Sequence, residues 1–364
     1  MELHIKTLTP LWTGGVNGKA DRIYESGILG SLRWWYEAIV RGLGGTACDP
    51  SQDDTCRFDA GQYNKSQAGN ERQRLRDAGL CDVCQVFGAT GWKRRFRLEV
   101  TEDHTQPIWT EPDKMLNVRP PNRSRGWYLP PGRMGRFSIK IISDSETVSL
   151  LTACMLFLEK YGSIGAKPQL GYGFFQILNS SEIQEKAEHW EWGKISESRQ
   201  YNAILPNLNN FLFFSYRFHP ENPGWWTRVP GISRVASSVQ EPVSHHKIVP
   251  VAPSLKNEWR FSQWKGSRVE AQEIFGTIRP QRKRSRVAVS WAYKLEPGEW
   301  KIKGWAWLPS GQKPAHALWG IVSQEKIWKK IIGVRGDLRI YPERIFNQSQ
   351  KDSVLKKFLE EATT

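Results

Sequence analysis

The sequence lacks an apolar run of the roughly 18 residues needed to cross a bilayer. It is also poor in cysteine, with five in 364 residues, and no secretory signal is recognisable at its start. Thiols without such a signal indicate a reducing compartment, where cysteines bind metals or pack in cores and do not form disulfides. We therefore expect a cytoplasmic protein without membrane contact.

Signals for catalysis are equally scarce. Only His245 and His246 of the seven histidines are adjacent, and no carboxylate pair suited to two-metal phosphodiester chemistry stands out. The glycine-rich segment 161–177 lacks the G-x-x-x-x-G-K-[ST] order of a P-loop, so we expect no nucleotide cofactor. The chain is predicted not to be an enzyme. The alternative is a metal-independent ribonuclease with His245 or His246 as general base.

What the sequence does contain is positive charge and tryptophan. Lysine and arginine number 52 against 37 acidic residues, a net charge of +15 that favours a polyanionic partner through counterion release. The 18 tryptophans offer stacking surfaces for bases, although most are expected in cores or protein contacts. A further hypothesis is that the Trp-rich region 220–265 serves chiefly as a protein docking surface.

Arginine-rich clusters are the candidate nucleic-acid contacts. The planar guanidinium suits both phosphate binding and base stacking, and Trp92, Trp127 and Tyr128 lie within or beside two of the clusters. A single cluster is usually a solvated surface. The candidates are Lys93, Arg94, Arg95 and Arg97, then Arg119, Arg123 and Arg125, and finally Arg282, Lys283, Arg284 and Arg286.

The order of predicted elements defines the fold class. Strands at 2–8, 93–100, 137–142 and 172–178 alternate with helices at 30–42 and 146–161, which is the ferredoxin-like order. A fainter second cycle has strands at 211–218, 284–295 and 299–308, helices at 315–332 and 352–362, and an unassigned region at 220–260. We predict an α+β protein of two tandem ferredoxin-like (RRM-like) domains, 1–180 and 205–364. The first carries a Cys-containing insertion and a Pro/Arg-rich loop, 105–135, too broken by proline for regular structure.

Four cysteines are candidate metal ligands. Cys81 and Cys84 form a C-x-x-C pair, and Cys48 and Cys56 precede them across a polar loop. Four soft ligands suit tetrahedral zinc, which would supply folding energy to a segment with little core of its own. A redox pair or free structural thiols are the alternatives. Cys154, on the apolar helix, is expected to pack in the core.

Four segments resemble a known family. They are TPLWTGGVNG at 9–18, GILGSLRWWYEAIVRGLGG at 27–45, CDVCQVFGATGW at 81–92 and GAKPQLGYGFF at 165–175. Together they resemble the RAMP superfamily, and within it the first-numbered RAMP subunits of type III-B CRISPR (Cmr) effector complexes. The second half matches mainly through a Phe-Gly, basic, strand segment at 272–289.

The resemblance implies two RAMP domains, assembly with other RAMP subunits, and a role in antiviral defence. It also implies binding of single-stranded guide or target RNA near the 3′ end of the guide, with target cleavage by a different subunit. The alternative within the same superfamily is a metal-independent endoribonuclease that processes guide-RNA precursors with His245 or His246. RNA contacts would fall on Arg33 and Arg41 of the LRWW helix, on Lys167, and on the basic residues after each Phe-Gly. The alternative for Arg33 and Arg41 is ion pairing with Glu37 on one helix face.

Overall fold

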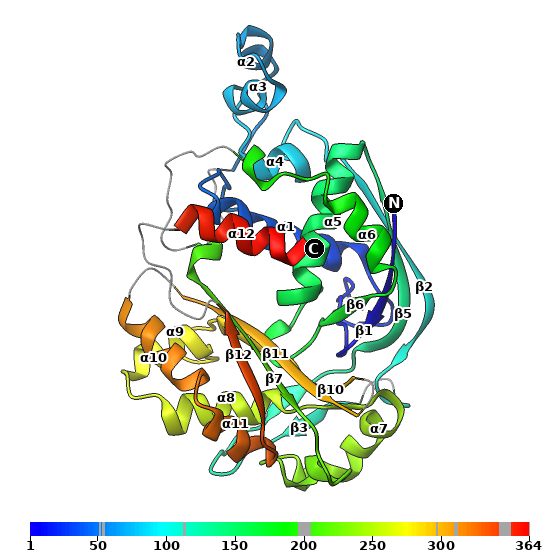
Figure 1. Ribbon diagram of the computed structural model, residues 1–364, viewed down its shortest axis with the longest axis vertical. Helices are drawn as coiled ribbons and strands as arrows, with labels where there is room; N and C mark the ends of the chain where they lie inside the picture. Colours follow the sequence, from blue (N-terminus) through cyan, green and yellow to red (C-terminus); the bar gives the residue numbers. More distant parts are fainter. Residues whose placement is uncertain are drawn as a thin grey trace.

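The computed structural model describes residues 1–50, 52, 55–111, 114–195, 205–295, 298–308, 312–341 and 351–363. Its strands form two main antiparallel sheets and a small hairpin (Figure 1). Within this part of the chain, no helix combines the length and apolar character needed to span a membrane.

The first sheet has the ferredoxin-like topology. Its strand order is β2-β5-β1-β6, with every neighbouring pair antiparallel, and α1 and α5 form the two crossovers. The elements are β1 (Glu2–Thr7), α1 (Glu25–Gly42), β2 (Arg97–Pro107), β5 (Arg133–Ile142), α5 (Ser145–Tyr161) and β6 (Phe175–Ile177), followed by α6 (Ser180–Ala187).

Local sequence explains these elements. In β1 the side chains of Leu3, Ile5 and Thr7 are buried, while the residues between them are exposed, as expected for a half-buried strand. Asp144 caps α5 by accepting a hydrogen bond from the Thr147 amide at 2.8 Å. In α1 the side chains of Leu32, Trp35 and Ile39 are buried, at the spacing of one helix face.

Two insertions decorate this half. The first contains α2 (Ala60–Lys65), α3 (Glu71–Asp77) and α4 (Asp82–Phe87), and α2 and α3 project from the body at the top of Figure 1. The second contains the hairpin β3 (Leu116–Val118) and β4 (Trp127–Leu129). The expectation of no regular structure over 105–135 is therefore wrong, because Pro120 and Pro121 lie on the loop between β3 and β4, and Pro130 and Pro131 follow β4, so that they leave the pairing intact.

The second sheet repeats the pattern. Its order is β12-β7-β11-β10-β8, and β9 also pairs with β11, which gives a second ferredoxin-like core extended by β8. Its elements are β7 (Phe211–Phe218), α7 (Ala236–His246), β8 (Ile248–Val249), α8 (Ala252–Asn257), a π-helical turn (Glu258–Gln263), α9 (Arg268–Phe275), β9 (Val287–Val289), β10 (Ala292–Lys294), β11 (Trp300–Trp307), α10 (Gln312–Val322), α11 (Glu325–Ile332) and β12 (Gly336–Tyr341). The α+β, tandem ferredoxin-like prediction is confirmed.

The two halves share side chains. Phe211 and Trp305 of the second sheet lie in the first hydrophobic core, and the terminal helix α12 (Lys351–Thr363) packs there through Leu355 and Leu359. Figure 1 accordingly shows α12 next to α1 and α5. The domain limits 1–180 and 205–364 stay a prediction, because α12 belongs to the second range but packs in the first hydrophobic core.

Candidate nucleic-acid interface and metal centre

A cavity of about 770 Å³ lies where the two halves meet. Three segments far apart in the sequence line it: the start of α1, the glycine-rich loop 163–169, and the basic loop 281–286. We call it the basic pocket. It brings together Lys167, Arg282, Lys283, Arg284 and Arg286, all of which the sequence singled out.

The glycine-rich loop presents Lys167 in an unusual backbone conformation. Its φ of 63° is left-handed, which few residues other than glycine adopt. The ammonium lies 4.0 Å from the centre of the Trp12 ring. Burial lowers the pKa of Lys167, and the nearby Arg282 lowers it further. Two cations that repel each other across a cavity favour binding of an anion between them.

The basic loop is closed by two backbone hydrogen bonds. Thr277 and Lys283 exchange N–H···O bonds of 3.0 and 2.9 Å. Glu273 pairs with Lys283 and with Arg286, the latter at 3.4 Å. In the described part of the chain, neither Arg282 nor Arg284 forms an ion pair, and both are exposed. These two arginines are therefore available to a phosphate.

The remaining wall of the pocket is aromatic. Trp34 of α1 and Trp305 of β11 lie 5.5 Å apart between ring centroids, and Trp307 also lines the cavity. The Arg286 guanidinium lies 4.6 Å from the centre of the Trp307 ring. Cations on one side and half-buried indoles on the other are the combination that binds unpaired nucleotides.

A buried lysine, which sequence reasoning missed, holds the two loops together. Lys256 is 1% exposed, and its Nζ donates to Gln169 O at 3.0 Å, Ser285 Oγ at 2.8 Å and Val287 O at 3.0 Å. Burial lowers its pKa to about 7. It lies in the unassigned region 220–260, where nothing in the sequence distinguishes it from a surface lysine.

Arg33 and Arg41 lie outside the pocket. Both pair with Glu37, at 3.0 and 3.4 Å, and Arg41 also donates to Cys48 O at 3.1 Å. Arg41 is 9% exposed. The ion pairing weighed for these residues is present, on a face that the cysteine region covers; their contact with RNA remains a prediction.

The cluster after the first Phe-Gly is largely occupied. Arg95 pairs with Glu71 at 3.0 Å and Arg97 with Glu99 at 2.9 Å, while Arg94 Nε donates to Phe96 O at 2.7 Å. Lys93 is exposed. None of the four lines the basic pocket, unlike the residues after the second Phe-Gly.

The cluster of Arg119, Arg123 and Arg125 lies on the loop between β3 and β4. Arg119 and Arg125 are exposed, and Arg123 lies over the Phe261 ring. These residues also lie outside the basic pocket. Their contact with RNA, like that of the preceding cluster, stays a prediction.

The four predicted metal ligands converge. The sulfur atoms of Cys48, Cys56, Cys81 and Cys84 lie within 4.8 Å of one another, with Cys48 and Cys84 at 3.5 Å. Tetrahedral zinc with bonds near 2.3 Å requires sulfur separations of about 3.8 Å, so the four thiols fit such an ion. Cys154 is fully buried in the first core, as predicted.

Thiol electrostatics agree with a cation at this place. Hydrogen bonds from Cys56, Cys81 and Cys84 lower the pKa of Cys48. Hydrogen bonding to Cys48 raises the pKa of Cys81 and of Cys84. One thiolate is thus easily held, whereas four need a compensating positive charge. Zinc here would tie the projecting α2–α3 unit to α4 and, through the Arg33 bond to Cys84 Sγ, to α1.

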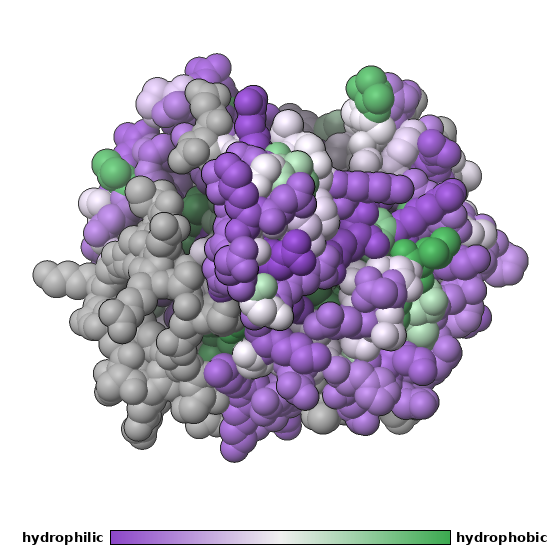
Figure 2. Space-filling model, turned by 90° about the horizontal axis from the view of Figure 1, so that it is seen from above, coloured by the Kyte–Doolittle hydropathy of each residue, from purple (hydrophilic) through white to green (hydrophobic). Residues whose placement is uncertain are grey.

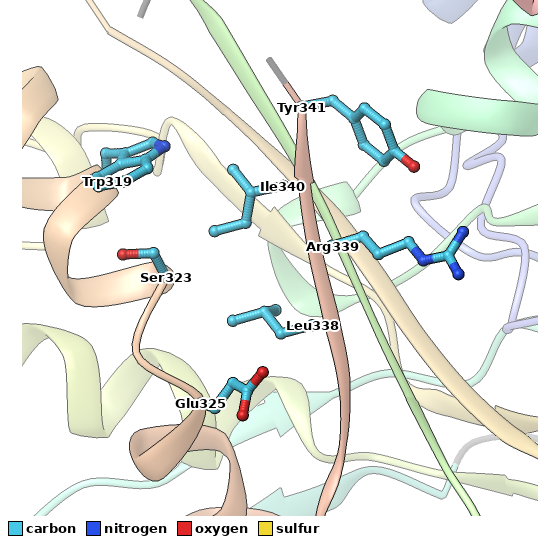
Figure 3. Close-up of a pocket in the computed structure, with 7 residues that line it drawn as sticks. All are labelled: Trp319, Ser323, Glu325, Leu338, Arg339, Ile340 and Tyr341. Atoms are coloured by element: carbon cyan, nitrogen blue, oxygen red, sulfur yellow. The ribbon is translucent and has the colours of Figure 1, made fainter. Parts of the chain in front are cut away.

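Two further sites differ in character from the basic pocket. A cavity between α10 and β12 is lined by residues that include Trp319, Leu338 and Ile340, and Arg339, on the other side of β12 from Trp319, pairs with Asp337 (Figure 3). His245 and His246 end α7 and do not line the basic pocket. Burial lowers the pKa of His246 to about 4.

Seen from above, hydrophilic side chains cover most of the coloured part of the surface, with a few small apolar patches (Figure 2). The tryptophans of the region 220–265 are mostly internal, because Trp225, Trp226 and Trp259 are buried in the second core.

The chain is similar to a known structure in fold and to a protein family in sequence. Among solved structures, the chain is similar to Cmr1 from Pyrococcus furiosus in its apo form, with 14% identity and a TM-score of 0.42 over 93% of this chain and 97% of that one. No curated protein matches the sequence. The model of the RAMP superfamily matches residues 4–176, a stretch that contains α1, the four cysteines and the glycine-rich loop. Over this stretch the chain is similar to the RAMP superfamily.

Proposed function

We propose that this protein is a non-catalytic subunit of a type III-B CRISPR effector complex and binds single-stranded guide or target RNA across the basic pocket. One observation carries the proposal. Lys167, Trp34 and the Arg282–Arg284 segment, from three distant parts of the sequence, line one cavity at the junction of two ferredoxin-like halves.

The chemistry of the pocket favours a single strand. The unpaired Arg282 and Arg284 offer forks for phosphate oxygens, and the indoles of Trp34 and Trp307 offer faces for bases. Bases in a duplex are stacked on each other and cannot reach such faces. The resemblance to the Cmr subunits makes guide or target RNA near the 3′ end of the guide the proposed ligand.

Membership of the effector complex follows from family and motif. Residues 4–176 match the RAMP superfamily, and the LRWW helix and glycine-rich loop, which resemble the Cmr subunits, both line the pocket. The proposed partners are the other RAMP subunits, in the cytoplasm and in antiviral defence. Zinc at the four cysteines is proposed as a structural element.

The test is fluorescence-anisotropy binding of labelled single-stranded RNA across a salt series in EDTA, with duplex RNA and single-stranded DNA alongside. Arg282→Ala/Arg284→Ala should weaken binding about tenfold and reduce the steepness of the log–log salt dependence by about 1.4, as expected for two lost phosphate contacts. Lys140→Ala/Lys186→Ala, which removes two exposed lysines elsewhere, is the matched control.

A denaturing gel of the same samples separates binding from cleavage. Intact RNA supports the non-catalytic subunit. Cut RNA that His245→Ala/His246→Ala leaves whole would establish the endoribonuclease alternative instead. An unchanged salt dependence in the arginine variant would show that the pocket is not the binding site.

A further inference from the structure

A second basic and aromatic surface lies outside the pocket. Phe261, in the π-helical turn after α8, is 47% exposed, a large fraction for an aromatic ring. The Arg123 guanidinium lies 3.8 Å from the ring centroid and that of Arg260 lies 4.9 Å from it. Two segments far apart in the sequence thus converge on one exposed ring.

The positive charges at this surface have no internal counter-charge. Across the described residues, Arg123, Arg260 and Arg268 form no ion pair with a carboxylate. Burial lowers the pKa of Arg260, and Arg123 and Arg268 lower it further. Such convergence of like charges is unfavourable in the free protein, and a bound anion would relieve it.

This surface adjoins the basic pocket through a shared loop. Arg260 Nη1 donates to Gly276 O at 2.5 Å, and Gly276 opens the loop that carries Arg282 and Arg284. The Trp264 and Phe275 rings, 5.9 Å apart, pack the turn against the end of α9. A strand leaving the pocket over this loop therefore meets Arg260 next.

We infer that Arg123, Arg260, Phe261 and Arg268 form a second contact for the same single strand, in which a base stacks on the Arg123 guanidinium above Phe261 and phosphates bind Arg260 and Arg268. The inference rests on the proposed function and extends it by defining the path of the RNA strand. That path runs from the pocket across the loop at 276–286 toward the β3–β4 hairpin.

A nucleic acid suits this surface better than an acidic peptide does. A guanidinium 3.8 Å from a ring centroid offers a stacking partner to a base, whereas a carboxylate binds at the edge of the fork. An exposed phenyl ring beneath it adds apolar contact that a carboxylate does not use. The stacked geometry therefore favours a base, and the neighbouring arginines favour its phosphates.

The experiment compares two lengths of unstructured RNA, about 4 and about 16 nucleotides, by competition anisotropy on the full chain. Phe261→Ala and Arg123→Gln should weaken binding of the longer RNA at least about fivefold and leave the shorter RNA unchanged. Phe261→Trp, which keeps a stacking face, should restore the affinity. Leu178→Ala, at another exposed apolar residue, and Lys186→Ala are the matched controls.

The outcomes separate this inference from the proposed function. If wild-type protein binds neither RNA, the proposed function fails. If it binds both, Arg282→Ala/Arg284→Ala weakens both and Phe261→Ala weakens neither, the pocket stands and this second contact is wrong. Loss of long-RNA binding in Phe261→Ala without recovery in Phe261→Trp would also overturn it, because stacking would not be the cause.

Discussion

Two groups of cations in this protein look alike in sequence and differ in structure. Around the cysteines, Arg33, Arg41, Arg76 and Arg95 each bond a carboxylate, and we call them the paired arginines. In the basic pocket, Lys167, Arg282 and Arg284 have no carboxylate partner within the described residues, and we call them the pocket cations. A basic run in a sequence therefore does not by itself identify a binding surface.

The difference lies in what the neighbouring elements bring. Glu37, Asp82 and Glu71 lie on α1, α4 and α3, so packing these helices around the cysteines places carboxylates beside the arginines. The pocket is lined by the start of α1, two loops and the end of β11, and the one acid that lines it in the described part of the chain, Glu273 of α9, pairs with Lys283 and Arg286. On the proposed function, the paired arginines stabilise the fold and the pocket cations bind the RNA.

The largest expected effect comes from loss of the proposed zinc site. Cys81→Ser/Cys84→Ser should abolish one bound zinc per chain and unfold the segment 46–92, because structural zinc contributes about 10 kcal/mol or more to the folding of small units. Zinc analysis and hydrogen exchange across this segment measure both effects. Cys154→Ala, a buried cysteine outside the cluster, should keep its zinc. Equal zinc in the two variants would show that the four thiols do not bind it.

The paired arginines themselves are tested by Glu37→Ala. Glu37 is 5% exposed and bonds both Arg33 and Arg41, so its removal leaves a buried guanidinium without a counter-charge. We expect a loss of about 3 to 5 kcal/mol in the free energy of unfolding, measured by urea denaturation. RNA affinity of the folded fraction should not change. A large loss of affinity at unchanged stability would instead place the RNA on α1.

Much of this organisation could be predicted from the sequence. The alternation in 2–8 and the apolar helix at 146–161 encode their elements locally, and the strand at 211–218 coincides with β7. The C-x-x-C pair and the two upstream cysteines likewise predict the cluster of four thiols. By contrast, the edge strand β12 was missed, and the predicted helix 315–332 is two helices, α10 and α11.

The pocket itself could not be predicted, because it depends on tertiary contacts. Nothing near Arg282 in the sequence indicates that Trp34 and Lys167 will face it. Nor does the sequence show that Glu71, rather than solvent, will meet Arg95. Phe261 and Arg123 are separated by more than a hundred residues, and only the folded chain brings them into contact.

Lys256 sharpens the comparison, as a buried cation bonded only to oxygens that carry no charge. Its usual pKa of 10.5 falls to about 7, so between these values the unfolded chain holds the extra proton and folding becomes more favourable as pH rises. The stability of wild type relative to Lys256→Met should therefore increase by up to about 1 kcal/mol per pH unit from pH 7 to 9. Urea denaturation at several pH values measures this. Lys301 and Lys303, whose pKa values are also lowered, are common to both proteins. If the difference in unfolding free energy between wild type and Lys256→Met does not vary with pH, Lys256 stays charged in the folded protein from pH 7 to 9.

The smallest expected effect comes from Arg97→Ala, which asks whether an exposed ion pair behaves like the paired arginines or the pocket cations. The Arg97 side chain is 73% exposed and its bond to Glu99 is 2.9 Å, so solvent screens the pair. We expect a change in unfolding free energy within about 0.5 kcal/mol. RNA affinity should stay at the wild-type value, because Arg97 lies outside the basic pocket. Urea denaturation and the RNA salt series measure these quantities, with Glu99→Ala as the control that removes the same pair from its other side. If Arg97→Ala weakens RNA binding and Glu99→Ala strengthens it, β2 carries RNA as well, and pairing with a carboxylate no longer separates the two groups of cations.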